Sequence, residues 1–362
     1  MNNVRKFVTE AEKLERQFAD DIARLAEELD VLPKARDVSG LDAAWRDVTN
    51  SRSKLAKYLR DTLENIDVGN ASDAHQRLQS RKAIKELNAI RKKLGLWSRV
   101  RPIVTAQLAP EPRSLIEKDV ASNRQPAVLD QVVSLFLQSM HVLANPTSES
   151  QGDQARRHGC HRDIPYPIYR FSRTIGAAHR ICLALRRQRP LRFLDVGSGG
   201  GTKVLAATTC FDRCDGLEYD EDAVATGRRF LEILAPERCR LIHGDALEFS
   251  HYGAYDVIYF YRPLMDSCKL LEMEERIVSQ ATRGTVLLKV GGIGKDLLPA
   301  MGAHEVADQV YVSGMSEDEA CELAETAKHM GRMIPGFKRR SFSGHGYWRP
   351  LLQVSARNGY YV

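Results

Sequence analysis

The first hundred residues place apolar side chains at the spacing of an amphipathic α-helix. Between residues 4 and 29 they recur every three or four positions, which puts them on one helical face. The same spacing returns over residues 41–66 and 78–94, and the runs end near Pro33, the "DVGNASD" segment and Gly95. The pattern predicts three helices with short connections, arranged as a hairpin, a small bundle or a coiled-coil arm that dimerises.

The middle of the chain interrupts this pattern. Residues 102–125 are mixed and contain proline, which is typical of a connector. Residues 126–146 are apolar enough to predict a buried helix, and the polar residues 148–159 predict a mobile loop. We therefore expect three parts: a helical domain over 1–105, a helical connector with the mobile loop over 106–160, and a second domain over 161–362.

From residue 161 onward, short apolar strands alternate with helices. A helix is predicted over 172–187 and a strand over 191–196, and a further helix starts at Thr202. Strands then follow in "CDGLEYD", "RLIHGDA", "YDVIYFY" and "GTVLLKV", with helices predicted over 221–234 and 268–282. This alternation predicts a parallel sheet covered by helices on both faces.

The C-terminal part of the chain carries weaker signals. Residues 316–331 form a helical pattern in which Ser316 and Glu319 have the spacing of a capping box. The last 27 residues, "GFKRRSFSGHGYWRPLLQVSARNGYYV", contain two strand-like pieces that predict a closing antiparallel hairpin. His345 and Trp348 would then border an acceptor pocket or serve as turn residues.

Composition narrows the class of protein. The 362 residues are 43% hydrophobic and 28% charged, as in a soluble globular protein, and no apolar run approaches the roughly 20 residues of a membrane span. The charged N-terminus lacks a signal peptide, which predicts a cytoplasmic protein. Neither the seven scattered cysteines nor the "HGCHRD" segment has the spacing of a disulfide framework or a zinc site, so we expect no metal.

The net charge of +6 is unevenly distributed. Residues 1–30 hold five Lys and Arg against eight Asp and Glu, whereas residues 74–101 hold nine Lys and Arg against Glu86 alone. The basic segment is either a face for the phosphates of a partner or a solvated face that lies beside the acidic first helix.

A glycine-rich turn, "DVGSGGG", follows the first strand of the second domain. A dinucleotide fingerprint would need glycine where the chain has Thr202, and a phosphate loop would need Ser or Thr after Lys203. An acid before a G-x-G-x-G turn instead suits a ligand with a positively charged end. At this point the sequence resembles the class I S-adenosylmethionine-dependent methyltransferases, in which this acid and turn hold the methionine and ribose part of the cofactor. The residues that carry this resemblance are Asp195, Gly197, Ser198, Gly199 and Gly201.

Two more acids follow the next two strands. The resemblance implies that Glu218, with Tyr219 beside it, accepts hydrogen bonds from the ribose hydroxyls. It also implies that Asp245 accepts from the adenine amino group while the backbone amide of Ala246 meets a ring nitrogen. The alternative is that Glu218 and Asp245 are helix N-caps, because both precede helix-like segments.

The fourth strand ends in "FYRPL", where the family places its acceptor. Tyr261 is expected to orient the acceptor, by a hydrogen bond or a π contact, and Arg262 to pair with an acidic acceptor or a phosphate. The alternative is that Tyr259 and Tyr261 only pack against neighbouring side chains. Amino-methylating DNA enzymes carry an Asn/Asp/Ser-Pro-Pro-aromatic motif at this place. This chain has Tyr261, Arg262 and Pro263 instead, which disfavours that activity. The first motif also loosely resembles the Dot1-like lysine methyltransferases.

The resemblance implies a Rossmann-like α/β fold with a seven-stranded and mostly parallel sheet, and the hydrophobic periodicity predicts an all-α domain before it. It implies methyl transfer from S-adenosylmethionine to an N or O nucleophile. The long helical extension and its basic segment 74–101 favour a macromolecular acceptor, either protein or RNA. We also expect a homodimer through the N-terminal helices and no association with a membrane. The alternatives are a small-molecule methyltransferase and a scaffold or sensor that binds the cofactor without turnover, while the glycine spacing disfavours a nicotinamide oxidoreductase.

Overall fold

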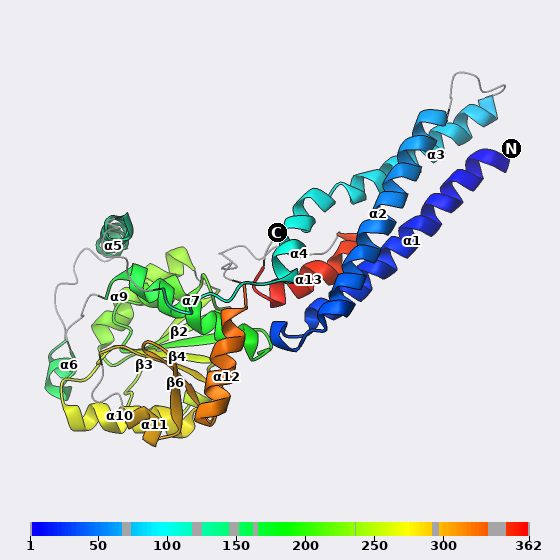
Figure 1. Ribbon diagram of the computed structural model, residues 1–362. Helices are drawn as coiled ribbons and strands as arrows, with labels where there is room; N and C mark the ends of the chain where they lie inside the picture. The colour runs from blue at the N-terminus through cyan, green and yellow to red at the C-terminus, as the bar shows by residue number, and fades with distance from the viewer. Residues whose placement is uncertain are drawn as a thin grey trace. The chain divides into compact units, whose positions relative to one another are not determined.

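The chain forms two compact units in the computed structural model (Figure 1). The structure describes residues 2–66, 74–117, 125–144, 152–161, 166–235, 237–291, 297–331 and 345–360. The helical unit spans residues 1–111 and 340–362, and the sheet unit spans residues 112–339. None of the helices in the described part of the chain combines the length and the apolar run that crossing a bilayer requires.

The helical unit confirms the three predicted N-terminal helices and adds two. Asp37 caps the second helix by accepting hydrogen bonds from the backbone N–H groups of Ser39 and Gly40. The fourth helix runs through Pro102 and ends at Leu108, so the first part of the stretch predicted to be a connector is helical, whereas residues 109–117 contain no helix or strand. The helices are α1 (Asn2–Asp30), α2 (Val38–Asn65), α3 (Ala74–Leu94), α4 (Trp97–Leu108) and α13 (Arg349–Arg357).

The C-terminal segment corrects the predicted hairpin and the predicted domain boundary. Its described residues, 345–360, form α13 and no strand, while residues 336–344 lie outside the described part of the chain; Trp348, which precedes α13, is fully buried in the core of the helical unit. Two edge-to-face contacts at 5.4 Å join the Phe18 ring of α1 to the rings of Tyr347 and Trp348, and the indole N–H of Trp348 donates to the Lys93 carbonyl. Trp348 therefore belongs to the helical core and does not border an acceptor pocket.

The sheet unit confirms the predicted alternation of strands and helices. Asp220 caps α9, and the capping box of Ser316 and Glu319 is present at the start of α12. Its strands are β1 (Arg192–Val196), β2 (Arg213–Glu218), β3 (Cys239–His243), β4 (Val257–Phe260), β5 (Val286–Lys289), β6 (Ala303–Ala307) and β7 (Val310–Ser313). Its helices are α5 (Gln125–Ala144), α6 (Asp153–His158), α7 (Ile168–Ala184), α8 (Thr202–Ala207), α9 (Glu221–Leu234), α10 (Ser267–Gln280), α11 (Leu297–Ala300) and α12 (Glu317–Lys328).

The seven strands form one sheet in the order β3-β2-β1-β4-β5-β7-β6. β1 to β5 are parallel, and β7 runs antiparallel between β5 and β6. Among the described residues, the antiparallel hairpin of the sheet is made by residues 303–313, and residues 345–360 of the tail take no part in it. The predicted fold class, a seven-stranded and mostly parallel sheet with an all-α N-terminal region, is confirmed.

Helices cover both faces of the sheet, as the predicted strands require. On one face the Phe171 ring of α7 meets the Tyr259 ring edge-on at 5.0 Å, and Phe193 stacks on Phe211 at 5.4 Å. On the other face Met273 and Ile277 of α10 belong to one apolar cluster with side chains of β1, β4 and β5.

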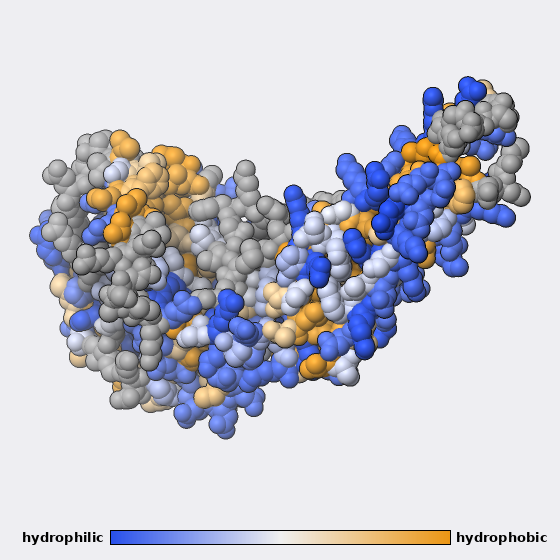
Figure 2. Space-filling model, turned by 45° about the horizontal axis from the view of Figure 1, so that its top comes forward, coloured by the Kyte–Doolittle hydropathy of each residue, from blue (hydrophilic) through white to orange (hydrophobic). Residues whose placement is uncertain are grey.

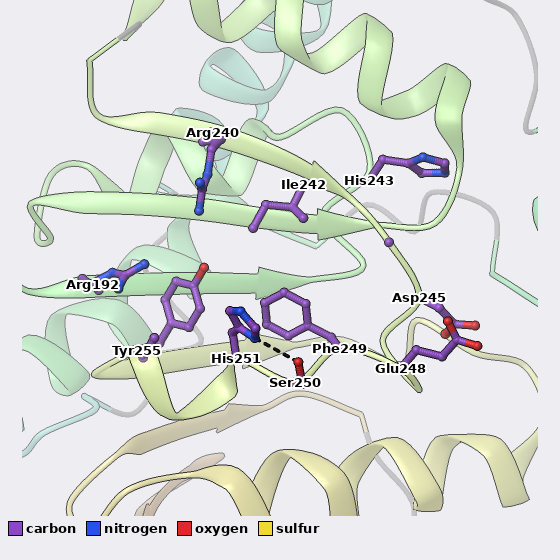
Figure 3. Close-up of a pocket in the computed structure, with 12 residues that line it drawn as sticks. Arg192, Arg240, Ile242, His243, Asp245, Glu248, Phe249, Ser250, His251 and Tyr255 are labelled. Atoms are coloured by element: carbon purple, nitrogen blue, oxygen red, sulfur yellow. Dashed lines mark hydrogen bonds between the residues drawn. The ribbon is translucent and has the colours of Figure 1, made fainter.

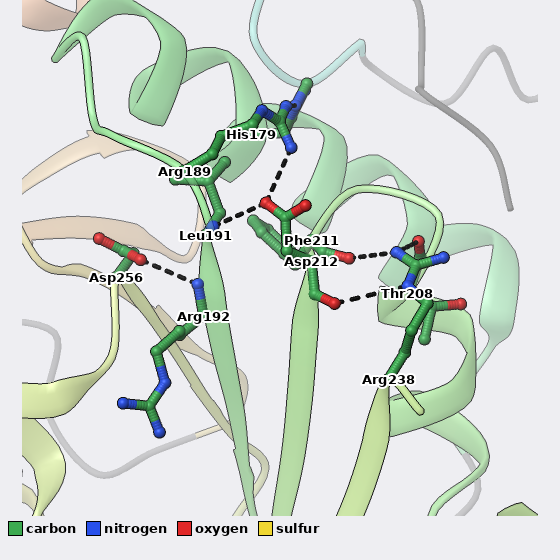
Figure 4. Close-up of polar contacts among 9 residues, drawn as sticks. All are labelled: His179, Arg189, Leu191, Arg192, Thr208, Phe211, Asp212, Arg238 and Asp256. Atoms are coloured by element: carbon green, nitrogen blue, oxygen red, sulfur yellow. Dashed lines mark hydrogen bonds and ion pairs between the residues drawn. The ribbon is translucent and has the colours of Figure 1, made fainter. Parts of the chain in front are cut away.

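Carboxylates fix the amino ends of β1 and β4 (Figure 4). Asp212 accepts from the Leu191 backbone N–H at 2.7 Å and from the Arg189 guanidinium at 3.0 Å. Asp256 accepts from the Arg192 backbone N–H at 2.8 Å. These contacts hold β1 in register with its neighbours at the amino ends of the strands, opposite the glycine turn at their carboxyl ends.

The part of the sheet unit that precedes α7 departs from prediction in two ways. α5 is helical as expected, but it is not buried: the side chains of Val128, Leu135 and Phe136 are more than half exposed, and Figure 2 shows apolar residues gathered over this helix. Within the predicted mobile loop, residues 153–158 form the short helix α6, while 148–151 lie outside the described residues.

Candidate functional site

The glycine-rich turn joins β1 to α8 in a backbone conformation that its glycines make accessible. Gly197, Gly199 and Gly201 have φ angles of 77°, 52° and 79°, in the left-handed region. A Cβ on Gly197 would lie 2.5 Å from the Cβ of Pro263, so the loop after β4 packs directly on this turn. The three glycines therefore suit the backbone of the turn, and Gly197 is also required by the close approach of the loop after β4.

Glu218 ends β2 and holds the glycine turn. One carboxylate oxygen accepts from the Gly199 backbone N–H at 2.8 Å, and the other accepts from the Asp220 backbone N–H at 2.9 Å. The residue is only 8% exposed. Burial raises the pKa of Glu218, although both backbone N–H groups oppose that shift. Glu218 is not a helix cap, because Asp220 caps α9.

Asp195 lies beside Tyr259 at the carboxyl end of β1. The two residues are register partners on adjacent parallel strands, so their side chains leave the same face of the sheet. Each is 1% exposed. The pKa of the Tyr259 phenol is raised by burial first and then by the charge of Asp195.

Asp245 follows β3 and begins a tight turn. Its Oδ1 accepts from the Leu247 backbone N–H at 2.8 Å, and its Oδ2 lies 3.1 Å from Nε2 of His158. The segment after Asp245 is a turn and not a helix, so the helix-cap alternative is wrong for this residue too. The Ala246 carbonyl accepts from the Tyr252 hydroxyl at 2.8 Å, which fixes the backbone next to Asp245.

The carboxylates at these strand ends converge on one region. Burial raises the pKa of the Cys160 thiol to about 12, and the charges of Glu218, Asp245 and Asp220 reinforce the effect. The backbone of Cys160 forms an isolated antiparallel bridge with Leu264, in the loop after β4. The predicted cofactor acids after β2 and β3 are thus brought together around one buried side chain.

Aromatic side chains form the carboxyl end of β4. The half-buried Tyr261 ring lies against Gly291, where an added Cβ would be 3.0 Å from its Cε2. The ring centroid of Tyr166 is 5.2 Å from that of Tyr261 and 6.4 Å from that of Tyr259. Arg262 is exposed and has a φ of 41°, an unusual value for a residue other than glycine.

A cavity of about 560 Å³ lies beside β3 and the following loop (Figure 3). Asp245 and Glu248 line one end, and Arg192 and Arg240 line the other. Arg240 donates to Asp215 at 2.9 Å, while the Arg192 guanidinium lies 4.7 Å from the centre of the Tyr255 ring. Both arginines are thus engaged within the sheet unit, and the cavity meets the predicted cofactor residues only at its Asp245 end.

Three of the buried polar atoms that make no hydrogen bond lie at this site. Within the described residues, the Ser198 hydroxyl in the glycine turn, the Tyr259 hydroxyl and Nε2 of His158 are buried and make no hydrogen bond. Such atoms are rare in folded proteins, because each one has lost its water without a replacement. Their gathering around the glycine turn and the strand ends fits a site that a polar ligand completes.

Sequence reasoning misses two side chains of this site. Tyr166 gives no signal, because it precedes a helix and no spacing links it to β4. His158 gives only a weak one, as part of the "HGCHRD" segment that lacks the spacing of a zinc site. In the structure its ring stacks on Tyr219, with centroids 4.0 Å apart and an interplanar angle of 13°. The described residues contain no group of His, Cys, Asp and Glu arranged to hold a metal ion.

The strand order and the glycine turn define a class of fold. A sheet ordered β3-β2-β1-β4-β5-β7-β6 with β7 antiparallel is that of the class I S-adenosylmethionine-dependent methyltransferases. The fold is therefore the one that the resemblance implied; the Dot1-like likeness stays confined to the first motif.

Comparisons with solved structures give partial likenesses. An RNA methyltransferase from Salinibacter ruber in complex with S-adenosyl-L-homocysteine is 21% identical, over 35% of this chain and 76% of its own, with a TM-score of 0.30. Magnesium protoporphyrin IX methyltransferase (ChlM) from Synechocystis PCC 6803, with bound SAM, is 12% identical, over 51% of this chain and 89% of its own, with a TM-score of 0.32.

A third structure, the amino pentose methyltransferase CalS10 from Micromonospora echinaspora, is 22% identical with a TM-score of 0.28. That match covers 36% of this chain and 58% of CalS10, so this chain spans less than two thirds of that protein. Neither a protein-family model nor a curated protein matches the sequence.

Proposed function

We propose that the protein is a methyltransferase that uses S-adenosylmethionine. One observation carries the proposal: Asp195, Glu218 and Asp245 lie in or just after the carboxyl ends of three neighbouring parallel strands, beside a turn whose three glycines are all in the left-handed region. Ligands of open parallel sheets bind at this carboxyl edge. The partnerless Ser198 hydroxyl in the turn supports the same site.

Different residues would bind the ribose, the adenine and the methionine part of the cofactor. Glu218 would hold the ribose hydroxyls with the free lone pairs of a carboxylate that the backbone already orients. Asp245, Ala246 and Tyr219 would hold the adenine, and Asp195 with the glycine turn would hold the methionine part. When bound, S-adenosylmethionine would supply a methyl carbon that an aligned nucleophile attacks, while the carbon–sulfur bond breaks and its electron pair leaves with sulfur as the neutral thioether of S-adenosylhomocysteine.

The acceptor would lie at the end of β4. Tyr166, Tyr259 and Tyr261 present aromatic rings there, and the Tyr259 hydroxyl is a buried group with no hydrogen-bond partner. Aromatic faces stabilise a positively charged methyl donor, and a phenol positions an acceptor lone pair toward it. The exposed Arg262 would pair with an acidic or phosphate group of the acceptor.

A macromolecular acceptor, protein or RNA, is supported by the exposed face of α3. Arg81, Lys85 and Lys92 are exposed and spaced at i, i+4 and i+11, which places them on one side of the helix. Lys93 is different, since it forms an ion pair with Glu15 of α1 at 2.9 Å. The basic segment thus combines the two interpretations: one lysine pairs with the acidic first helix, and the remaining stripe faces solvent.

Ligand binding tests the cofactor assignment. Calorimetry with S-adenosylhomocysteine should detect binding to the wild-type protein, and Glu218→Gln and Asp195→Asn should each weaken it at least about tenfold, as the loss of a charge-assisted hydrogen bond predicts. Glu221→Gln, which removes an exposed acid from the first turn of α9, is the matched control and should bind normally. Undiminished binding in both site variants would contradict the assignment.

Transfer of a tritiated methyl group tests turnover and the acceptor class. Cell-extract fractions treated in turn with protease and with nuclease show whether protein, RNA or a small molecule receives the label. Charge reversal at Arg81, Lys85 and Lys92 should lower transfer to a macromolecule and reduce its salt dependence. Binding without transfer in any fraction would favour the scaffold alternative, and sedimentation of the intact chain tests the expected homodimer.

A further inference from the structure

His158 lies against the two side chains that the proposed function assigns to adenine. Its ring is stacked on Tyr219 at a centroid distance of 4.0 Å, and its Nε2 is 3.1 Å from Oδ2 of Asp245. A flat, nitrogen-bearing ring therefore lies on the aromatic surface and against the carboxylate that would receive the adenine ring and its amino group. Both the His158 and Asp245 side chains are largely buried, at 18% and 15% exposed.

The contact with Asp245 is close but incomplete. Nε2 of His158 is buried and makes no hydrogen bond, despite its distance from the carboxylate. A buried polar atom without a partner costs free energy, so this arrangement is easily exchanged for one in which a ligand donates to Asp245. Adenine offers both a larger stacking surface and an amino group that can donate.

The segment that carries His158 is fastened to the site on both sides. The Gly152 backbone N–H donates to the Asp220 carboxylate at 2.8 Å, and the Lys269 ammonium donates to the His158 carbonyl at 3.1 Å. Just beyond, the Gly159 carbonyl accepts from the Met265 N–H, and the His161 N–H donates to the Pro263 carbonyl. α6 therefore connects the adenine end of the site with the acceptor loop after β4.

We infer that His158 is a built-in occupant of the adenine position, which the cofactor must displace in order to bind. The inference rests on the proposed function and adds regulation to that same site. Because residues 159–161 are hydrogen-bonded to residues 263–265, displacement of His158 also disturbs the loop that carries Tyr261 and Arg262. Cofactor entry and the arrangement of the acceptor loop are thereby linked.

Removal of the occupant should improve cofactor binding. In calorimetry, His158→Ala should bind S-adenosylhomocysteine about tenfold more tightly than the wild type, the size expected when one competing aromatic contact is removed. Adenosine should show the same gain, because the competition concerns the adenine ring. Methionine should show no gain. The matched control is Arg157→Ala, which removes the preceding, exposed side chain of α6 and should leave both affinities unchanged.

The opposite role for His158 gives the opposite result. If the histidine stays in place and helps to hold adenine, His158→Ala will weaken the binding of both ligands while the wild type binds normally, and the inference is wrong although the proposed function stands. Unchanged affinity in His158→Ala also overturns it. If neither the wild type nor the variant binds either ligand, the proposed function fails, and the displacement inferred from it fails with it.

Hydrogen exchange in the wild-type protein distinguishes displacement of His158 from closure of α6 over the ligand. On addition of S-adenosylhomocysteine, the amides of residues 153–160 should exchange faster, because the segment loses the contacts of His158, while those of residues 197–201 should exchange more slowly. Slower exchange in both segments would show that α6 closes over the ligand, which contradicts displacement.

Discussion

Two clusters of buried polar side chains, one in each unit, differ in how completely they are hydrogen-bonded. In the helical unit the Gln107 amide donates to the Ser355 hydroxyl at 2.8 Å, and the Asn358 amide donates to Gln107 at 3.0 Å and to the Leu29 carbonyl at 2.9 Å. In the sheet unit, near the carboxyl ends of β1 and β4, the hydroxyls of Ser198 and Tyr259 are buried and make no hydrogen bond.

The difference separates polar groups that the fold satisfies from hydroxyls that it leaves without a hydrogen-bond partner. The Gln107 cluster joins α1, α4 and α13, and its partners complete one another, so its role is to fix the C-terminal helix in the helical core. The Ser198 and Tyr259 hydroxyls surround the glycine turn and contribute no such bond. Buried polar side chains therefore complete the core of the helical unit, while under the proposed function those of the sheet unit complete their hydrogen bonds with a ligand.

The strongest predicted loss of stability comes from removing one donor of the Gln107 cluster. Asn358→Ala leaves the Leu29 carbonyl and the Gln107 amide oxygen buried without this donor, and should lower the free energy of unfolding by about 1–3 kcal/mol. Urea denaturation measures this loss. Asn65→Ala, which removes an exposed amide at the end of α2, is the control and should change little. A loss as small as that of the control would show that the cluster is not a stabilising element.

A pH-dependent effect is expected at the incomplete site. Burial raises the pKa of Glu218 above its ordinary value of 4.5, so the folded state holds this proton to higher pH than the unfolded state does. The stability that this group contributes is therefore present below pH 4.5 and is lost as pH rises through the raised pKa. Glu218→Gln cannot titrate, so its stability relative to the wild type should increase as pH rises from about 4 to about 7.

Urea midpoints of both proteins, measured across that pH range, test this sign. Glu221→Gln should track the wild type, because its side chain is exposed. If the difference between Glu218→Gln and the wild type fell with rising pH, the carboxylate would be stabilised in the fold, and Glu218 would belong with the complete cluster instead.

The smallest expected effect on stability compares two buried tyrosines of the sheet unit. Tyr259→Phe removes a hydroxyl that makes no hydrogen bond and should change the free energy of unfolding by less than about 0.5 kcal/mol, whereas Tyr252→Phe removes the donor to Ala246 and should cost about 1 kcal/mol. Thermal or urea unfolding measures both. Tyr259→Phe should nevertheless lower methyl transfer, and equal losses of stability in the two variants would contradict the comparison.

Much of the sheet unit is predictable because its signals are local. The bounds of α9 match the prediction, since Asp220 caps its first turn and apolar residues recur along one face. The spacing of Gly197, Gly199 and Gly201 is enough to identify the turn, because few other residues adopt its φ angles. Glu218 and Asp245 follow from their places after apolar strands.

Other predictions fail where a distant partner decides the conformation. The C-terminal tail has strand-like pieces, but Trp348 packs on Phe18 and donates to Lys93, which favours a helix in the helical core. α5 is apolar enough to be buried, yet periodicity does not show whether a partner covers the helix, and Phe136 is exposed. Pro102 predicts an end to regular structure, although α4 continues through it.

The alternation of elements, the glycine turn and the acids at the carboxyl ends of three strands can be read from the chain alone, because each depends on the conformational preferences of a few neighbouring residues. Long-range packing places the tail in the helical unit, Tyr166 against Tyr261 and His158 on Tyr219. Those contacts join residues separated by long stretches of chain, and they form only when the whole core selects which surfaces pack together.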